Sequence, residues 1–90
     1  MAKISFTSAL KRFYPTLEPI EIKGNSIAEI LALLEKKHSG LTDFLIDEQG
    51  ELRQHINIFI GDKMLMDRLE LTDRVEAQDE ILIFQALSGG

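Results

Sequence analysis

The stretch SIAEILALLE, residues 26–35, decides the fold of this 90-residue chain. Its large apolar residues recur with the spacing i, i+3, i+4 and i+7, at Ile27, Ile30, Leu31 and Leu34. This spacing places them on one stripe of an α-helix, because a helix turns once in about 3.6 residues. The stripe predicts a helix with one buried side, and Leu31→Asp is expected to unfold the domain.

Both ends of this helix are marked by residues that satisfy its unpaired backbone groups. Ser26 and Glu29 have the S-x-x-E spacing of a capping box, in which each side chain accepts a hydrogen bond from the other residue's backbone N–H. Lys36 and Lys37 fall in the last turn, where positive charge complements the exposed carbonyls. Gly40 suits the left-handed closing conformation, so the helix is predicted to end before it.

Two strands are predicted on the N-terminal side of the helix. Ile4 and Phe6 alternate with polar residues, which is the pattern of a strand with one buried face. A second strand is predicted over residues 18–22. Pro15 would interrupt a helix or a central strand, so we interpret residues 11–15 as the loop of a first hairpin.

Two further strands are predicted on the C-terminal side, after a short apolar segment and a glycine-containing turn at residues 44–50. In the first, residues 54–60, isoleucine occupies every second position, so one face is aliphatic and the other carries polar groups and Phe59. A long loop over residues 65–75 leads to the last strand, residues 81–84. That strand is apolar on both faces, so we place it centrally and parallel to the first.

The order strand, strand, helix, strand, strand predicts an α+β roll, in which a mixed sheet packs on one main helix. We expect residues 1–85 to form a single domain and residues 86–90 to form a flexible C-terminal tail. The sequence contains no repeat, linker or low-complexity stretch.

Composition and charge exclude several classes of function. The chain has no cysteine, which excludes disulfides, thiolate zinc sites and a thiol nucleophile. Its formal net charge of -5 repels phosphate backbones and anionic lipids, so we expect no nucleic-acid or membrane binding and a basic partner. We find no apolar signal segment and no run long enough to span a bilayer, and therefore expect a soluble cytoplasmic protein.

No catalytic or metal-binding constellation is recognisable. His38 and His55 lie 17 positions apart in different predicted elements, so we expect no metal site. The acidic pairs Asp47-Glu48 and Asp79-Glu80 have the chemistry of a general acid and base. They sit beside predicted turns, however, where solvated charge is the usual explanation. We therefore expect the chain not to be an enzyme.

Four apolar residues form a candidate partner-binding surface. By strand alternation they lie on the sheet face away from the helix: Phe59, Leu82, Phe84 and Leu87. An exposed apolar patch on that face would mark a docking surface. The alternative is that the hairpin loop or residues 65–71 cover the patch, because scattered surface apolar residues are common. The sequence leaves both open.

Gly89-Gly90 follows shortly after the last predicted strand. Glycine lets a backbone pass where a β-carbon would collide, so the pair suits a carboxylate that enters a narrow slot. Residues 86–90, extended at roughly 3.3 to 3.6 Å each, reach about 17 Å into a partner. The alternative is a frayed terminus without function.

Several segments together resemble the MoaD/ThiS family of sulfur carriers, and its MoaD-like members in particular. They are NIFIG at residues 57–61, the L-x-L-T-D stretch at residues 69–73, DEI at residues 79–81 and the terminal Gly89-Gly90. Members of this family have the ubiquitin-like β-grasp fold. The resemblance implies that fold for residues 1–85.

The resemblance also implies a function for the tail. Gly90 is the implied reactive residue, whose carboxylate becomes an acyl-adenylate and then a thiocarboxylate, and Gly89 gives the tail access. The implied partners are a ubiquitin-activating-type adenylyltransferase that consumes ATP, a sulfur donor or sulfurtransferase, and a large synthase subunit. The chain itself binds no cofactor and acts as a protein cosubstrate.

Four functions stay open at this point. The leading one is sulfur transfer in cofactor biosynthesis, like that of the small subunit of molybdopterin synthase. The second is sulfur transfer in amino-acid biosynthesis of the cysteine or methionine type. The third is a ubiquitin-like modifier that joins Gly90 to lysine, and the fourth is a passive β-grasp binding module.

Overall fold

A computed structural model describes residues 1–12 and 17–85. Its strands are β1 (Ala2–Phe6), β2 (Ile20–Ile22), β3 (Ile56–Ile60), β4 (Lys63–Met64) and β5 (Glu80–Gln85). Its helices are α1 (Ser8–Lys11), α2 (Ile27–Lys37) and α3 (Thr42–Leu45). The main helix, α2, is the one that the opening stretch predicts. No helix in the described part of the chain is long and apolar enough to cross a membrane.

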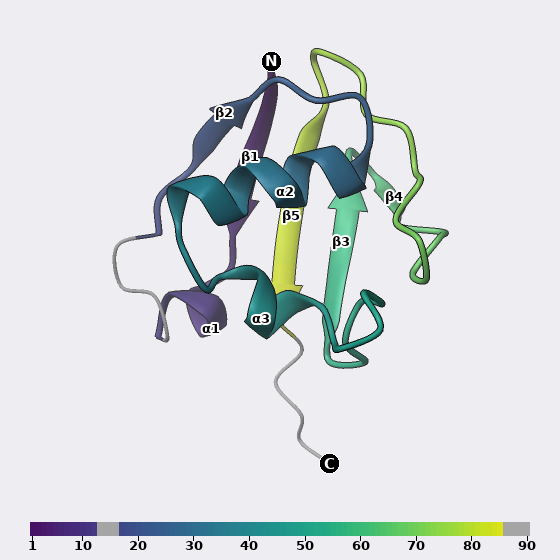
Figure 1. The fold of residues 1–90 in the computed structure, drawn as a ribbon. Helices are drawn as coiled ribbons and strands as arrows, with labels where there is room; N and C mark the ends of the chain where they lie inside the picture. The colour runs from purple at the N-terminus through teal and green to yellow at the C-terminus, as the bar shows by residue number, and fades with distance from the viewer. Residues whose placement is uncertain (13–16, 86–90) are drawn as a thin grey trace.

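The five strands form one mixed sheet in the order β2-β1-β5-β3-β4 (Figure 1). β5 lies in the middle, parallel to β1 and antiparallel to β3. The prediction of a central last strand parallel to the first is therefore confirmed. β5 takes this place because both of its faces are apolar, and a central position lets both be partly covered.

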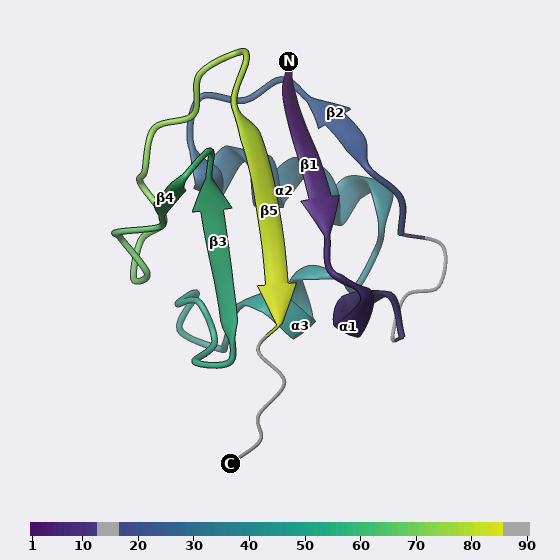
Figure 2. The same ribbon diagram turned by 180° about the vertical axis from the view of Figure 1, so that it is seen from behind.

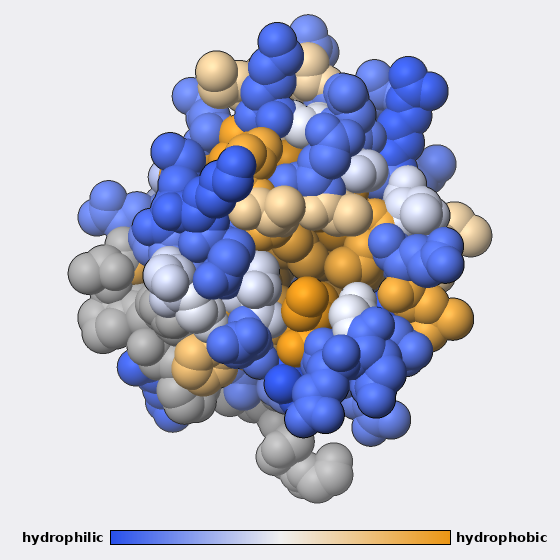
Figure 3. Space-filling model, viewed as in Figure 1, coloured by the Kyte–Doolittle hydropathy of each residue, from blue (hydrophilic) through white to orange (hydrophobic). Residues whose placement is uncertain are grey.

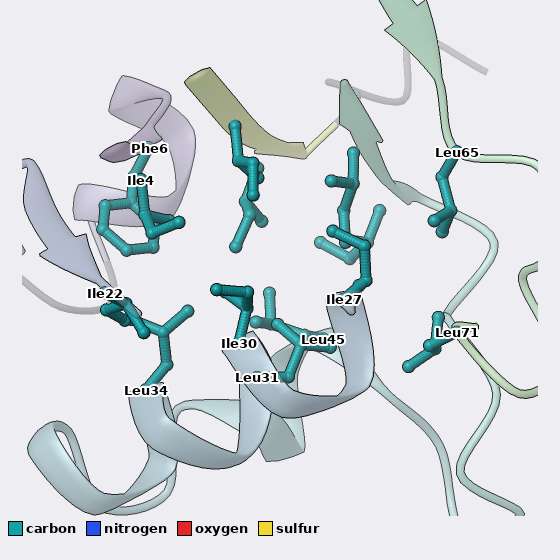
Figure 4. Close-up of a cluster of buried hydrophobic side chains, with 14 of the residues drawn as sticks. Ile4, Phe6, Ile22, Ile27, Ile30, Leu31, Leu34, Leu45, Leu65 and Leu71 are labelled. Carbon is teal, nitrogen blue, oxygen red and sulfur yellow. The ribbon is translucent and has the colours of Figure 1, made fainter. Parts of the chain in front are cut away.

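Helix α2 crosses one face of the sheet, and the side chains between them form the core (Figure 4). The four residues of the predicted stripe are at most 3% exposed. Ile58 of β3 and Ile83 of β5 face them from the sheet and are fully buried. Burying one such side chain contributes about 1.5 to 3 kcal/mol. The α+β roll with one main helix is thus confirmed.

The predicted boundaries of α2 are also confirmed, and one of the two capping-box bonds is present. Ser26 Oγ accepts a hydrogen bond from the Glu29 N–H at 3.3 Å, and Gly40 has a φ of 90°. Glu35 adds a link that the pattern does not reveal, because its carboxylate accepts from the N–H groups of Gly40 (2.7 Å) and Thr42 (3.1 Å). These bonds, that of Gly40 most, lower the pKa of Glu35 and tie the end of α2 to α3.

Three short elements occupy segments for which the sequence analysis predicts neither a helix nor a strand. α1 takes up part of the predicted hairpin connection, α3 includes part of the apolar segment at 44–50, and β4 precedes the predicted loop at 65–75. Each has four residues or fewer, too short for a periodic pattern to reveal it. The predicted strand starts at residues 18 and 54 are wrong, since β2 begins at Ile20 and β3 at Ile56.

Candidate functional site

Figure 2 shows the sheet face opposite α2, and on this face an apolar row crosses β5, β3 and β4. The strand register pairs Leu82 of β5 with Phe59 of β3, and Phe59 with Met64 of β4. Residues paired in this way point to the same face of a sheet, so the three side chains are neighbours. Phe59 and Leu82 are half-buried, and Met64 is 48% exposed.

Phe84 extends this row toward the C-terminal end of β5. Its ring stacks on that of Phe59, with the ring centroids 5.3 Å apart and an angle of 14° between the planes. Phe84 pairs in register with Asn57, whose side-chain amide donates a hydrogen bond to Met64 Sδ at 3.2 Å. We call the surface formed by these four side chains the open-face patch: Phe59, Met64, Leu82 and Phe84.

The open-face patch contains three of the predicted partner-binding residues and one that the sequence reasoning missed. Met64 was missed because β4 has only two residues. Leu87, Gly89 and Gly90 lie outside the described residues. The part that all these residues play in binding or chemistry stays a prediction.

One alternative was that residues 65–71 cover the open-face patch. The leucines that this segment buries do not lie over the patch. Leu65 and Leu71 are buried and belong to the core on the α2 side of the sheet (Figure 4). Met66 and Leu69 of the same segment are strongly exposed. The hairpin loop of the other alternative includes residues 13–16, which lie outside the described residues.

A row of charges crosses the same face at the other end of β5. Lys3 of β1 lies opposite Glu21 of β2 on one side and Glu80 of β5 on the other. All three side chains are exposed. The face is therefore apolar toward the end of β5 and charged toward its start, where Lys3 is in register with a glutamate on each neighbouring strand.

One member of each acidic pair that the sequence singled out is engaged in a turn. Asp47 accepts hydrogen bonds from the N–H groups of Gln49 (2.9 Å) and Glu51 (3.0 Å). Asp79 accepts from the Glu76 N–H at 2.8 Å. Within residues 1–12 and 17–85, no group of three or more metal-ligating side chains is placed to hold an ion. The positions of the Asp47 and Asp79 carboxylates are explained by these hydrogen bonds to the local backbone.

Asp67 organises the loop after β4, which the sequence reasoning did not foresee. Its carboxylate accepts hydrogen bonds from the N–H groups of Leu69, Glu70 and Thr72 and from the Thr72 hydroxyl. The Glu70 bond, followed by that of the Thr72 hydroxyl, does most to lower the pKa of Asp67 to about 2. This network supports the positive φ of 59° at Leu71, which is unusual for a residue other than glycine.

A second apolar area lies beside α2, on the face of the molecule that carries this helix (Figure 3). It is a groove of about 520 Å³ between α2 and the segments around Ile46 and Leu71. Glu35, Lys36 and Glu70 also line it, so its walls carry both signs of charge. This mixture does not select one kind of occupant.

Comparison with known proteins adds a family and a fold. A model of the ThiS family matches residues 8–90. The sulfur carrier protein CysO of Mycobacterium tuberculosis (strain ATCC 25618 / H37Rv) is 22% identical over 97% of this chain and 96% of that protein.

Two solved structures illustrate the likeness in three dimensions. A chain in the crystal structure of the Amycolatopsis orientalis BexX/CysO complex matches with a TM-score of 0.84 and 25% identity, over 100% of both chains. SAMP1 from Haloferax volcanii matches with a TM-score of 0.77 and 22% identity, over 99% of this chain and 98% of that one. The ubiquitin-like β-grasp fold that the resemblance implies is therefore confirmed.

Proposed function

The chain belongs to the ThiS family of sulfur carriers, and from this premise we propose that Gly90 is the residue that carries the sulfur. In the proposed reaction the Gly90 carboxylate attacks the α-phosphate of ATP, which gives an acyl-adenylate and releases pyrophosphate. Sulfide from a sulfur donor then attacks the acyl carbon and displaces AMP. The products are a thiocarboxylate, AMP and one proton.

The chemistry of this reaction belongs to the partner proteins. The proposed adenylyltransferase binds the ATP and supplies the hydrogen-bond donors that stabilise the developing charge. The carrier contributes the carboxylate, and Gly89 leaves the approach to the acyl carbon free of a β-carbon. The carrier is consumed and regenerated as a cosubstrate.

The open-face patch is the observation that carries this proposal. Its aromatic residue Phe84 lies one position before Gln85, where the described chain ends and the predicted tail begins. Partly exposed aromatic residues and methionine grouped in this way are residue types enriched at protein interfaces. A partner that binds this patch contacts β5, the strand that directly precedes residues 86–90.

For the sulfur acceptor, we propose an amino-acid precursor of the cysteine type. The support is the relative named sulfur carrier protein CysO, which aligns with 97% of this chain. The sequence alone put cofactor biosynthesis first, and we now place it second. Sulfur from a labelled thiocarboxylate should accordingly appear in cysteine after incubation with extract of the source cells, and label in a pterin would favour the cofactor role.

The test of the carrier function is the intact mass of the natural protein. It is incubated with ATP, a sulfur donor and candidate adenylyltransferases from the same organism. We expect the mass gain that results when sulfur replaces one carboxylate oxygen. A variant that lacks Gly90 should show no gain, whereas Ser88→Ala, which changes the tail but keeps both glycines, should be converted normally.

Three results would contradict the carrier function. If no candidate enzyme forms an adenylate or a thiocarboxylate, the proposal loses its basis. Lysine adducts that require Gly90, without a thiocarboxylate, would assign a ubiquitin-like modifier. Partner binding that survives truncation after Ser88, again without conversion, would assign a passive binding module.

A further inference from the structure

The ladder between β1 and β5 ends at Thr7. In a parallel ladder, alternate residues of one strand donate and accept hydrogen bonds toward the other. Here the Lys3 N–H donates to the Asp79 carbonyl at 3.0 Å, and the Thr7 N–H donates to the Ile83 carbonyl at 3.2 Å. By the same pattern, the next bond would run from the Gln85 N–H to the Thr7 carbonyl.

The Thr7 carbonyl is engaged elsewhere. It accepts hydrogen bonds from the N–H groups of Leu10 (3.1 Å) and Lys11 (3.3 Å) in α1. The Gln85 N–H donates instead to Thr7 Oγ1 at 3.4 Å. The Thr7 hydroxyl therefore accepts the hydrogen bond that the Thr7 carbonyl, which is engaged by α1, does not accept.

The Thr7 hydroxyl does not make the capping hydrogen bond that is usual at its position. Thr7 is the N-cap of α1, and a threonine there ordinarily accepts from a backbone N–H in the first helical turn. Thr7 makes no such side-chain bond. A residue that departs from its local rule to serve a distant strand is typical of a functional position.

We propose that Thr7 is a positioning residue for the C-terminal tail. Its hydroxyl holds the amide of Gln85 from the β1 side, while Ile56 pairs with Gln85 from the β3 side. The residue to which residues 86–90 are bonded thus lies between two strands, and the Thr7 hydroxyl is the acceptor for its amide. This inference rests on the proposed function, because a fixed base raises the effective concentration of the Gly90 carboxylate at the active site of a bound partner.

Two variants isolate the hydroxyl. Thr7→Val keeps the shape of the side chain but removes the acceptor, and Thr7→Ser keeps the acceptor. In Thr7→Val we expect the Gln85 amide to exchange with solvent about three- to tenfold faster, the range for loss of one hydrogen bond. With the adenylyltransferase we expect kcat to fall by a similar factor at unchanged KM, because the open-face patch is intact. Thr7→Ser should restore both values.

The outcomes separate the two proposals. Unchanged exchange at Gln85, an unchanged kcat, or a raised KM at unchanged kcat would each overturn the positioning role of Thr7. If Thr7→Val does not melt cooperatively, Thr7→Ala takes its place in the same measurements. If the wild-type protein is not converted, the carrier function fails and this role fails with it. Conversion of wild type and Thr7→Val at equal rates would overturn the Thr7 role alone.

Discussion

Neighbouring residues of β5 face two different surroundings. Ile81 and Ile83 point toward α2 and are at most 1% exposed, whereas Leu82 and Phe84 point to the other side and are half-buried. The side chains on both faces are apolar, so their hydrophobicity does not distinguish them. The two faces differ in what covers them, since α2 packs on one face of the sheet and not on the other (Figure 1, Figure 2).

This comparison teaches that one strand can serve stability on one face and recognition on the other. The covered face removes its apolar area from water on folding, which stabilises the domain. The open face leaves part of its apolar area in water, where the proposed partner would cover it. Substitutions on the two faces should therefore affect different measurements.

The largest effect is expected from charges placed on adjacent residues of β5. Ile83→Asp buries an unpaired carboxylate in the core, which should abolish cooperative unfolding in thermal melts, as should Leu31→Asp on α2. Leu82→Asp, its matched control, places the same charge on the open face and should melt cooperatively. A soluble, cooperatively melting Ile83→Asp would contradict the division between the faces.

The next effect concerns partner affinity. Phe84→Ala removes an aromatic ring from the open-face patch and should weaken binding to the adenylyltransferase about tenfold or more, as for a hot-spot residue. Phe44→Ala removes a ring from α3, which is not part of the open-face patch, and should leave affinity unchanged. Titration calorimetry measures both. Equal losses of affinity in the two variants would contradict a role of the open-face patch in partner binding.

A smaller effect is expected from the charged row on the open face. Because we expect a basic partner, Glu80→Lys should slow association a few-fold at low salt, and the difference should shrink as salt screens the charges. Lys3→Glu should speed association. Glu48→Lys gives the same change in net charge at an exposed site in the 47–50 turn, and serves as the control. If it slows association equally, net charge and not the row is responsible.

The smallest effect concerns the loop that joins the two faces between Met64 and Leu71. The pKa of Asp67 is about 2 in the folded protein against an ordinary value of 3.8. The ionised carboxylate therefore stabilises the fold above pH 3.8, and this contribution disappears as the pH falls toward 2. The difference in urea midpoint between wild type and Asp67→Asn should be constant at neutral pH and shrink across that window. A pH-independent difference would argue against the ionised network.

The sequence was sufficient for the elements with a long, regular pattern. The stripe from Ile27 to Leu34 predicted α2, and the apolar run before Gln85 predicted a central parallel strand. The helix was predicted correctly because its stripe repeats over two turns, and the strand because a run that is apolar on both faces needs cover on both. β4 was missed because two residues carry no pattern, and Met64 was lost from the candidate surface with it.

The roles of Thr7 and Asp67 were beyond reach of sequence patterns for a different reason. Thr7 acts on Gln85, 78 positions away, and that pairing exists only after the sheet has formed. Asp67 acts locally, but its bonds to Leu69, Glu70 and Thr72 depend on a backbone conformation that includes a left-handed leucine. A sequence pattern shows neither kind of geometry.

The central place of β5 also has a consequence for synthesis of the protein. β5 pairs with β1 through residues such as Lys3 and Glu80, 77 positions apart, and it leaves the ribosome after every other strand. The sheet cannot close before β5 arrives, because it separates β1 from β3. A nascent chain whose residues 80–85 have not yet left the ribosome therefore lacks the central strand of the sheet. Residues 86–90, which we propose to be activated, leave the ribosome only after β5, so β5 can pair before they become available.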